Sequence, residues 1–239
     1  MINFYTCMIL LPIIYGLQDN RTTSSFSEYL KLYGDAGTYK AYIETQQSKL
    51  SKLSRKIVLI DIGRQKQIVS EFVTLFEKGR SGIKEMSGKS ILCLGARLGG
   101  EVRAFKSLGA LAIGLDLNPG PSSLDVLSGD FHNIAYPNES FDFAYSNVLD
   151  HIFDQNAFAS EVARILKPKS YFFASVYPDS FDAWTGPDAV SLRNKDAFIE
   201  KFKSRGFEVI DELHTTYSMK LTHFKTWDQK ISTYILRKL

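Results

Sequence analysis

The sequence predicts an α/β fold, a three-layer sandwich built on a doubly wound, mostly parallel seven-stranded sheet with an N-terminal helical extension. From residue 89 onward, short apolar runs alternate with amphipathic stretches, which is typical of βαβ units. The chain has 239 residues, 44% hydrophobic and 23% charged, which suits one large domain with a sizeable core. Right-handed crossovers then favour helices on both faces of the sheet and a ligand crevice at the carboxyl ends of its strands.

The N-terminus carries an apolar segment, residues 4–17, which is followed by a polar stretch. No Lys or Arg precedes it, Pro12 interrupts it, and it is shorter than the roughly 20 apolar residues of a spanning helix. This favours a packed or peripheral segment and a cytoplasmic location. Membrane association through residues 4–17 is the alternative.

The elements follow in order. Residues 27–42 suggest short helices broken near Gly34 and Gly37, and residues 64–78 have the 3.6-residue period of one helix. Apolar runs predict strands at residues 90–94, 111–117, 126–127, 141–146 and 171–176, with a closing pair at 207–213 and 231–236. Amphipathic spacing predicts helices at residues 99–108, 155–166 and 195–204.

Composition excludes several classes of site. The formal charge is only +3, and acidic and basic residues are interspersed, so a nucleic-acid partner is unsupported. The basic run at residues 49–56 is more typical of a solvated helix face than of a phosphate site. The two cysteines, Cys7 and Cys93, are too few for a disulfide framework or a cysteine zinc site, and the four histidines lack ligand spacing, so no metal is expected. Nothing in the sequence indicates an oligomeric state.

Polar or glycine-rich residues follow each of the first four predicted strands. Residues 95–100 (GARLGG) follow the first strand, Asp116 ends the second, residues 130–131 follow the third, and residues 146–147 follow the fourth. Because these strand ends converge on one crevice, their combination is more specific than any one of them. Singly, Asp116 could be a helix cap, Asp130 a turn former and Phe131 ordinary core.

In these features, residues 89–177 resemble the class I S-adenosylmethionine-dependent methyltransferases, especially the group with small-molecule substrates. Residues 94–99 match the family's glycine-rich turn, and Asp116 matches its acidic strand end. Residues 129–131 (GDF), 141–151 and 161–168 (EVARILKP) resemble its later motifs. The resemblance implies a Rossmann-like methyltransferase domain over residues 86–239, S-adenosylmethionine as cofactor, and a cover for the pocket formed by residues 1–85.

The cofactor's shape suggests a role for each matching residue. Gly95 and Gly99 allow a close backbone approach to the methionine and ribose portions. Asp116 can accept hydrogen bonds from the ribose hydroxyls, Asp130 can accept one from the adenine amino group, and the backbone amide of Phe131 lies beside it. Asn147, or its carbonyl, is expected near the methionine amino group or the sulfonium. Ala96, Arg97 and Leu117 complete the expected cofactor-binding set.

Two residues depart from the family's pattern. Cys93 stands where the first strand usually carries an acid, and Arg97 replaces the central glycine of the turn. One hypothesis is that Arg97 pairs with the cofactor's carboxylate, and its alternative is that Arg97 faces solvent or bonds Glu101. Arg97 also argues against a dinucleotide oxidoreductase, because a bulky side chain would stand where the pyrophosphate meets the backbone.

Methyl transfer from a sulfonium mainly requires alignment of the acceptor and exclusion of water. His151 is the candidate catalytic base, although a packed imidazole is an equally good interpretation. Tyr177 and residues 180–188 can line the acceptor site. The expected partner is a small-molecule acceptor of unidentified structure. The alternative function is a catalytically degenerate cofactor-binding domain that acts as an interaction or regulatory module, which Cys93 and Arg97 suggest.

Overall fold

The computed structural model describes residues 39–48, 55–79, 81–120, 124–178, 188–222 and 225–239. The chain forms two compact units, residues 1–42 and 43–239. The helices expected within residues 27–38, the apolar segment 4–17 and most of residues 180–188 lie outside the described residues, and the division at residue 85 stays a prediction. The first described helix is α3 (Tyr39–Ser48). The second unit contains the sheet and the candidate site.

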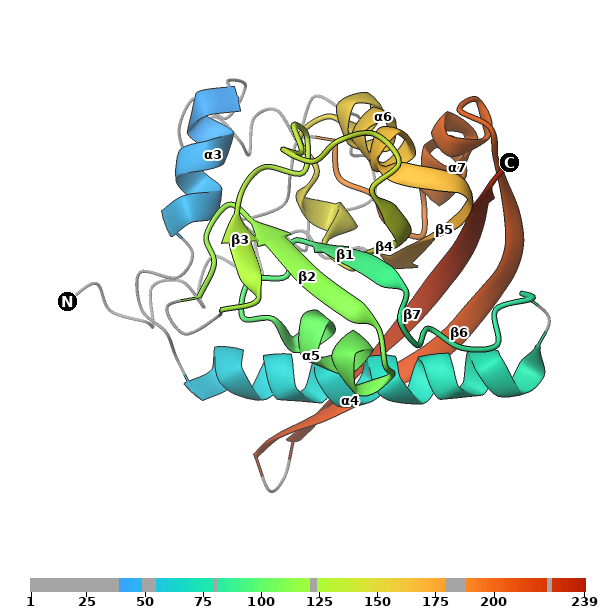
Figure 1. Ribbon diagram of the computed structural model, residues 1–239. Coiled ribbons are helices and arrows are strands. Elements are labelled where there is room, and N and C mark those ends of the chain that lie inside the picture. Colours follow the sequence, from blue (N-terminus) through green and yellow to red (C-terminus); the bar gives the residue numbers. More distant parts are fainter. Residues whose placement is uncertain (1–38, 49–54, 80, 121–123, 179–187, 223–224) are drawn as a thin grey trace. The chain divides into compact units, whose positions relative to one another are not determined.

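The second unit is built on a seven-stranded sheet with the order β3-β2-β1-β4-β5-β7-β6 (Figure 1). Strands β1 to β5 are parallel to one another, whereas β7 runs antiparallel to both β5 and β6. The predicted doubly wound fold class is therefore confirmed. The strand bounds are β1 (Ser90–Leu94), β2 (Leu111–Asp116), β3 (Val126–Ser128), β4 (Phe141–Ser146), β5 (Leu166–Val176), β6 (Phe207–Thr222) and β7 (Lys225–Lys238).

Helices cover both faces of this sheet (Figure 1). Helices α4 (Arg55–Lys78) and α5 (Gly100–Ser107) lie on one face, and α6 (Gln155–Ile165) and α7 (Lys195–Lys203) lie on the other. A short 3₁₀ helix, η2 (Leu149–His151), follows β4. The three layers of the sandwich are thus complete within residues 43–239.

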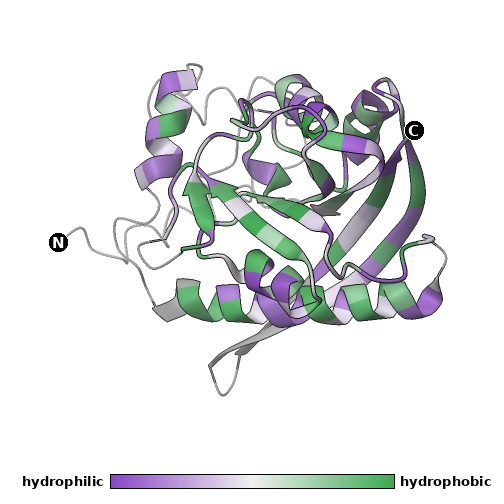
Figure 2. Cartoon of the chain, in the orientation of Figure 1, coloured by the Kyte–Doolittle hydropathy of each residue, from purple (hydrophilic) through white to green (hydrophobic). Residues whose placement is uncertain are grey.

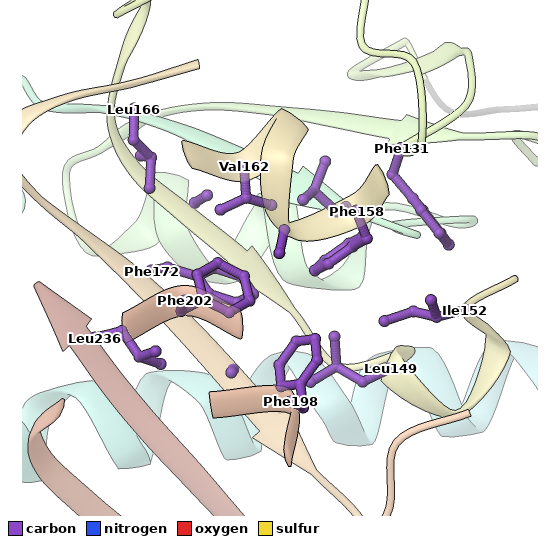
Figure 3. Close-up of a cluster of buried hydrophobic side chains, with 14 of the residues drawn as sticks. Phe131, Leu149, Ile152, Phe158, Val162, Leu166, Phe172, Phe198, Phe202 and Leu236 are labelled. Atoms are coloured by element: carbon purple, nitrogen blue, oxygen red, sulfur yellow. The ribbon is translucent and has the colours of Figure 1, made fainter. Parts of the chain in front are cut away.

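Side chains alternate between two hydrophobic cores along each central strand, as the two-residue period of a strand requires. In β5, Phe172 belongs to the core under α6 and α7, where it stacks on Phe202 with ring centres 4.9 Å apart (Figure 3). Its neighbour Phe173 belongs to the other core, where it meets Phe72 of α4 edge to face at 4.7 Å. Both faces of the sheet are therefore apolar, and hydrophobic positions predominate along β1 and β2 (Figure 2).

Three elements extend beyond their predicted limits. Helix α4 begins at Arg55 rather than at residue 64, and contacts of its first part with α5 through Asp61, rather than helix propensity, favour the extension. Strand β5 begins at Leu166, directly after α6. The hairpin of β6 and β7 continues as a two-stranded ribbon past residues 213 and 231, where cross-strand pairing rather than an apolar run holds the strands together.

Candidate functional site

The carboxyl ends of the central strands meet at one edge of the sheet. Leu94 at the end of β1 pairs with Leu115 of β2 and with Ser146 of β4. Asp116 at the end of β2 pairs with Ser128 of β3. This register brings the predicted turn, Asp116, the residues after β3 and Asn147 to the same edge, which is where a ligand crevice is expected in such sheets.

The turn after β1 begins with a glycine that the packing requires. Gly95 has a φ of +80°, and its amide donates to the carbonyl of Leu115 at 2.8 Å, as the amide of Ala96 does at 3.3 Å. A Cβ built on Gly95 would lie 2.1 Å from Cγ2 of Val148. The sequence assigned the absent Cβ to close approach of the cofactor. In the structure, the residue that it would meet is Val148, in the loop after β4.

Asp116 holds the same turn through its carboxylate. Its Oδ2 accepts a hydrogen bond from the amide of Arg97 at 3.0 Å, and its Oδ1 accepts one from the amide of Asn118 at 2.8 Å. A carboxylate can accept about four hydrogen bonds, so each oxygen retains a lone pair for a further donor. Asp116 therefore both fixes the turn and can accept from a diol.

The turn is left-handed at two further positions. Arg97 has a φ of 36° and Gly99 a φ of 78°, and the carbonyl of Arg97 accepts from the amide of Gly120 at 2.8 Å. Leu117, which directly follows Asp116, is partly buried beside this bend. The structure thus brings together Gly95, Ala96, Arg97, Gly99, Asp116 and Leu117 of the predicted set.

The N-terminus of α5 is occupied by a side chain of this chain. Asp61 of α4 accepts from the amide of Gly100 at 2.9 Å and pairs with Arg103. A helix N-terminus in a dinucleotide-binding fold instead receives the pyrophosphate. The Asp61 cap therefore supports the exclusion of a dinucleotide cofactor that Arg97 suggested.

Asp130 and Phe131 lie just beyond β3, and a histidine fixes the carboxylate. Oδ1 of Asp130 accepts from the amide of His132 at 2.8 Å and lies 2.9 Å from Nδ1 of its ring. Nε2 of His132 accepts from the amides of Phe153 and Asp154, so Nδ1 carries the proton that Asp130 accepts. The Asp-x-His spacing signals this positioning role of His132, which was not predicted from the sequence.

Phe131 is 6% exposed and packs edge to face on Phe158 of α6, with ring centres 5.3 Å apart (Figure 3). Its ring is consequently part of the core under α6 and α7. The predicted contact of Phe131 with the cofactor uses its backbone amide, so burial of the ring does not affect that prediction.

Asn147 is buried, and its side chain turns toward α5. Its Nδ2 donates to Oε1 of Glu101 at 2.9 Å, and the same oxygen accepts from Nη1 of Arg64 in α4 at 3.3 Å. The side-chain amide of Asn147 is thus engaged with Glu101, so the backbone of Asn147 is the part that can contact a ligand. Glu101 and Arg64 are the residues that sequence reasoning missed, because their contacts join segments far apart in the chain.

His151 lies in η2, which begins three residues after the last residue of β4. Its side chain is 16% exposed, and its Nε2 is 3.9 Å from Oδ1 of Asp150. Tyr177 follows β5, and the guanidinium of Arg64 lies 6.0 Å from the centre of its ring. Burial raises the pKa of the Tyr177 hydroxyl, although the nearby Arg64 charge opposes that rise. A candidate proton acceptor and a phenol therefore follow the adjacent strands β4 and β5.

Among the described residues there is neither a membrane-spanning helix nor a cluster of metal-ligating side chains. No helix among them is long and apolar enough to cross a bilayer. No group of three or more His, Cys, Asp or Glu side chains among them is arranged to hold a metal ion.

The fold and these strand ends define a Rossmann-like α/β domain with its ligand crevice at the carboxyl edge of the sheet. Residues 92–174 match the family model described as a methyltransferase domain. This part of the chain is a class I S-adenosylmethionine-dependent methyltransferase domain, as its motifs predicted, and S-adenosylmethionine is its cofactor. No curated protein sequence matches the chain.

Solved structures share the fold at low sequence identity. One comes from work on the conversion of a disulfide bond into a thioacetal group during echinomycin biosynthesis, with a TM-score of 0.53, 18% identity, and coverage of 70% of this chain and 80% of that one. A candidate sarcosine dimethylglycine methyltransferase from Galdieria sulphuraria has a TM-score of 0.52 and 17% identity, with 73% and 85% covered. A chain of the complex of the Haloferax volcanii Trm112 methyltransferase activator with an assigned methyltransferase has a TM-score of 0.51 and 19% identity, with 74% and 94% covered.

Proposed function

We propose that this protein transfers the methyl group of S-adenosylmethionine to a small-molecule acceptor. The observation that carries the proposal is the carboxylate of Asp116, which fixes the turn after β1 through the amide of Arg97 and keeps lone pairs for two further donors. That arrangement suits the two hydroxyls of a ribose beside a glycine bend.

Other residues of the chain contact the remaining parts of the cofactor in this proposal. Gly95, Ala96, Arg97, Gly99 and Leu117 form the wall beside Asp116, while Asp130 and the amide of Phe131 face the adenine. The carbonyl of Asn147 serves the methionine end. When bound, S-adenosylmethionine supplies an electrophilic methyl group on a sulfonium.

The acceptor binds beside Tyr177 and η2 in this proposal. His151 can take the proton that a hydroxyl or amine acceptor releases, because it follows β4 at the crevice and a neutral imidazole has a nitrogen that accepts a proton. Most of its side chain is buried, so a bound acceptor would meet it away from bulk water.

The test is calorimetric titration of the full chain with S-adenosylmethionine and S-adenosylhomocysteine, followed by turnover with candidate acceptors. Asp116→Asn should weaken binding roughly 10- to 150-fold, because hydrogen bonds to a charged acceptor contribute roughly 1.5–3 kcal/mol. Asp125→Asn is the matched control, since Asp125 is an exposed acid between β2 and β3 that pairs with Lys106.

Absence of binding by the wild-type chain would end the proposal. Binding without turnover on any acceptor would favour the degenerate module instead.

A further inference from the structure

The buried carboxylate of Glu101 lies at the centre of the candidate site, and its side chain is only 4% exposed. Glu101 stands in the first turn of α5, directly after the glycine-rich bend. It joins three elements, because its Oε1 accepts from Asn147 after β4 and from Arg64 of α4. Desolvating a carboxylate costs several kcal/mol, so such a group is held only where charged or polar partners repay it.

Both of these hydrogen bonds end on the same oxygen. Among the described residues, Oε2 of Glu101 accepts no hydrogen bond, and it is not sealed from the surface. Arg64 contacts Glu101 at 3.3 Å through one nitrogen, so the pair is not the bidentate arrangement that would use both oxygens. The carboxylate therefore retains capacity for one more cationic donor.

Glu101 also lies close to Cys93, the residue that replaces the usual acid of the first strand. Burial raises the pKa of the Cys93 thiol, and the nearby carboxylate of Glu101 raises it further. Glu101 thus brings a carboxylate from α5 into the neighbourhood of Cys93 in β1.

We propose that Glu101 binds the amino group of the cofactor's methionine portion through Oε2, with Arg64 and Asn147 holding the carboxylate in position. This inference rests on the proposed function, because it assigns a partner within the same cofactor site. Glu101 is a binding residue in this account, and Arg64 and Asn147 are positioning residues.

A purely structural role for Glu101 makes a different prediction. If Glu101 only ties α4, α5 and β4 together, its replacement should weaken every ligand of the crevice equally. If Glu101 binds the ammonium group, its replacement should weaken binding only of ligands that carry that group. S-adenosylhomocysteine carries the amino-acid portion, whereas 5′-methylthioadenosine has the same nucleoside and a sulfur without it, so the two ligands separate the roles.

The experiment measures the affinity of the full chain for both ligands by calorimetry, for wild type and for Glu101→Gln. We expect the substitution to weaken binding of S-adenosylhomocysteine at least tenfold and to change the affinity for 5′-methylthioadenosine less than twofold. Cys93→Asp added to Glu101→Gln should restore part of the lost affinity, because it returns a carboxylate to β1. Glu71→Gln is the matched control, since Glu71 is another buried glutamate of the same face, bound instead to Thr215 of β6.

An equal loss for both ligands, or no loss for either, overturns the inference while leaving the proposed function intact. Failure of the wild-type chain to bind S-adenosylhomocysteine overturns the proposed function itself. If Glu101→Gln does not fold, Glu101→Asp keeps the charge but withdraws it by one methylene. The same selective loss is then expected, and an equal loss for both ligands again overturns the inference.

Discussion

Arg97 adopts a backbone conformation that L-residues avoid, with a φ of 36°. The left-handed region costs a non-glycine residue roughly 1–2 kcal/mol. The turn holds it there through the amide bond to Asp116 and the carbonyl bond from Gly120. Among the described residues, Glu101 pairs with Arg64 and bonds Asn147, and no ion pair or hydrogen bond joins it to Arg97.

Replacement of Arg97 by alanine tests the pairing with the cofactor's carboxylate. Arg97→Ala should weaken binding of S-adenosylhomocysteine by roughly two- to fivefold, because partly exposed ion pairs contribute about 0.5–1 kcal/mol. Binding of 5′-methylthioadenosine, which lacks the carboxylate, should not change. Titration calorimetry measures both, with Lys106→Ala on the exposed side of α5 as control. Unchanged affinity for S-adenosylhomocysteine would refute the pairing.

Gly95 and Gly206 form a matched pair, because both have a φ of +80° but differ in their surroundings. A Cβ on Gly95 would overlap Val148, whereas a Cβ on Gly206 would meet nothing within 4 Å. Gly206→Ala should therefore cost only the backbone strain, roughly 1–2 kcal/mol. Gly95→Ala should cost roughly 1–3 kcal/mol more, through overpacking.

Urea denaturation of the two variants measures this difference in the free energy of unfolding. Val148→Ala combined with Gly95→Ala should recover part of the overpacking term, since it removes the methyl group that the new Cβ meets. Equal destabilisation by the two glycine substitutions would show that the Val148 contact has no energetic role.

At the scale of elements, α4 anchors α5 through Asp61. The Asp61 carboxylate accepts from the amide of Gly100 at 2.9 Å and pairs with Arg103, so it acts as the N-terminal cap of α5 from another helix. Gly99, which precedes the helix, provides no side-chain cap of its own. The turn after β1 is thus held on one side by Asp116 and on the other by α4.

Asp61→Ala should lower the free energy of unfolding by about 1–2 kcal/mol, the usual cost of losing a cap. Asp61→Asn keeps an acceptor oxygen for Gly100 and loses the charge that pairs with Arg103, so it should cost less. Urea denaturation measures both, with Asp125→Ala as the control for an exposed acid. A cost below about 0.5 kcal/mol for Asp61→Ala would exclude a capping role.

At the scale of the whole molecule, the sequence predicted the sheet but not the network inside the site. The limits of β1 and β4 match the predicted runs at residues 90–94 and 141–146, because buried parallel strands are short, continuous apolar runs. The ribbon of β6 and β7 was predicted too short, because polar residues interrupt its outer part, and cross-strand pairing rather than a continuous apolar run identifies it as strand.

The contacts of Glu101 explain the part of the site that the sequence did not reveal. Arg64 and Asn147 are 37 and 46 residues away from Glu101 in the chain. No local pattern joins them, and only the packing of α4 against α5 brings Arg64 to the strand ends. Motif spacing could place Asp116 and Asp130, because Asp116 ends β2 and Asp130 follows the end of β3 by two residues.

Two glutamates, the buried Glu71 and the ion-paired Glu161, make the stability of the whole molecule depend on pH in opposite directions. Burial raises the pKa of Glu71, although hydrogen bonds from Thr215 and Gln67 oppose the rise. The contribution of Glu71 to the free energy of unfolding is therefore complete at pH values below its ordinary pKa of 4.5. It is lost as pH rises through the pKa of Glu71 in the folded state. Hydrogen bonding to Arg164 lowers the pKa of Glu161, so its contribution is present above 4.5 and is lost as pH falls.

Glu71→Gln should consequently gain stability relative to wild type as pH rises above 4.5, because the amide has no proton to lose in the folded state. Glu161→Gln should be less stable than wild type at pH 7, and that deficit should shrink as pH falls below 4.5, because wild type then loses the same charged contacts. Urea denaturation of the three proteins from pH 3 to pH 9 measures both differences. Curves for Glu71→Gln and wild type that stay parallel across this range would show that Glu71 titrates normally in the folded chain, and parallel curves for Glu161→Gln would show the same of Glu161.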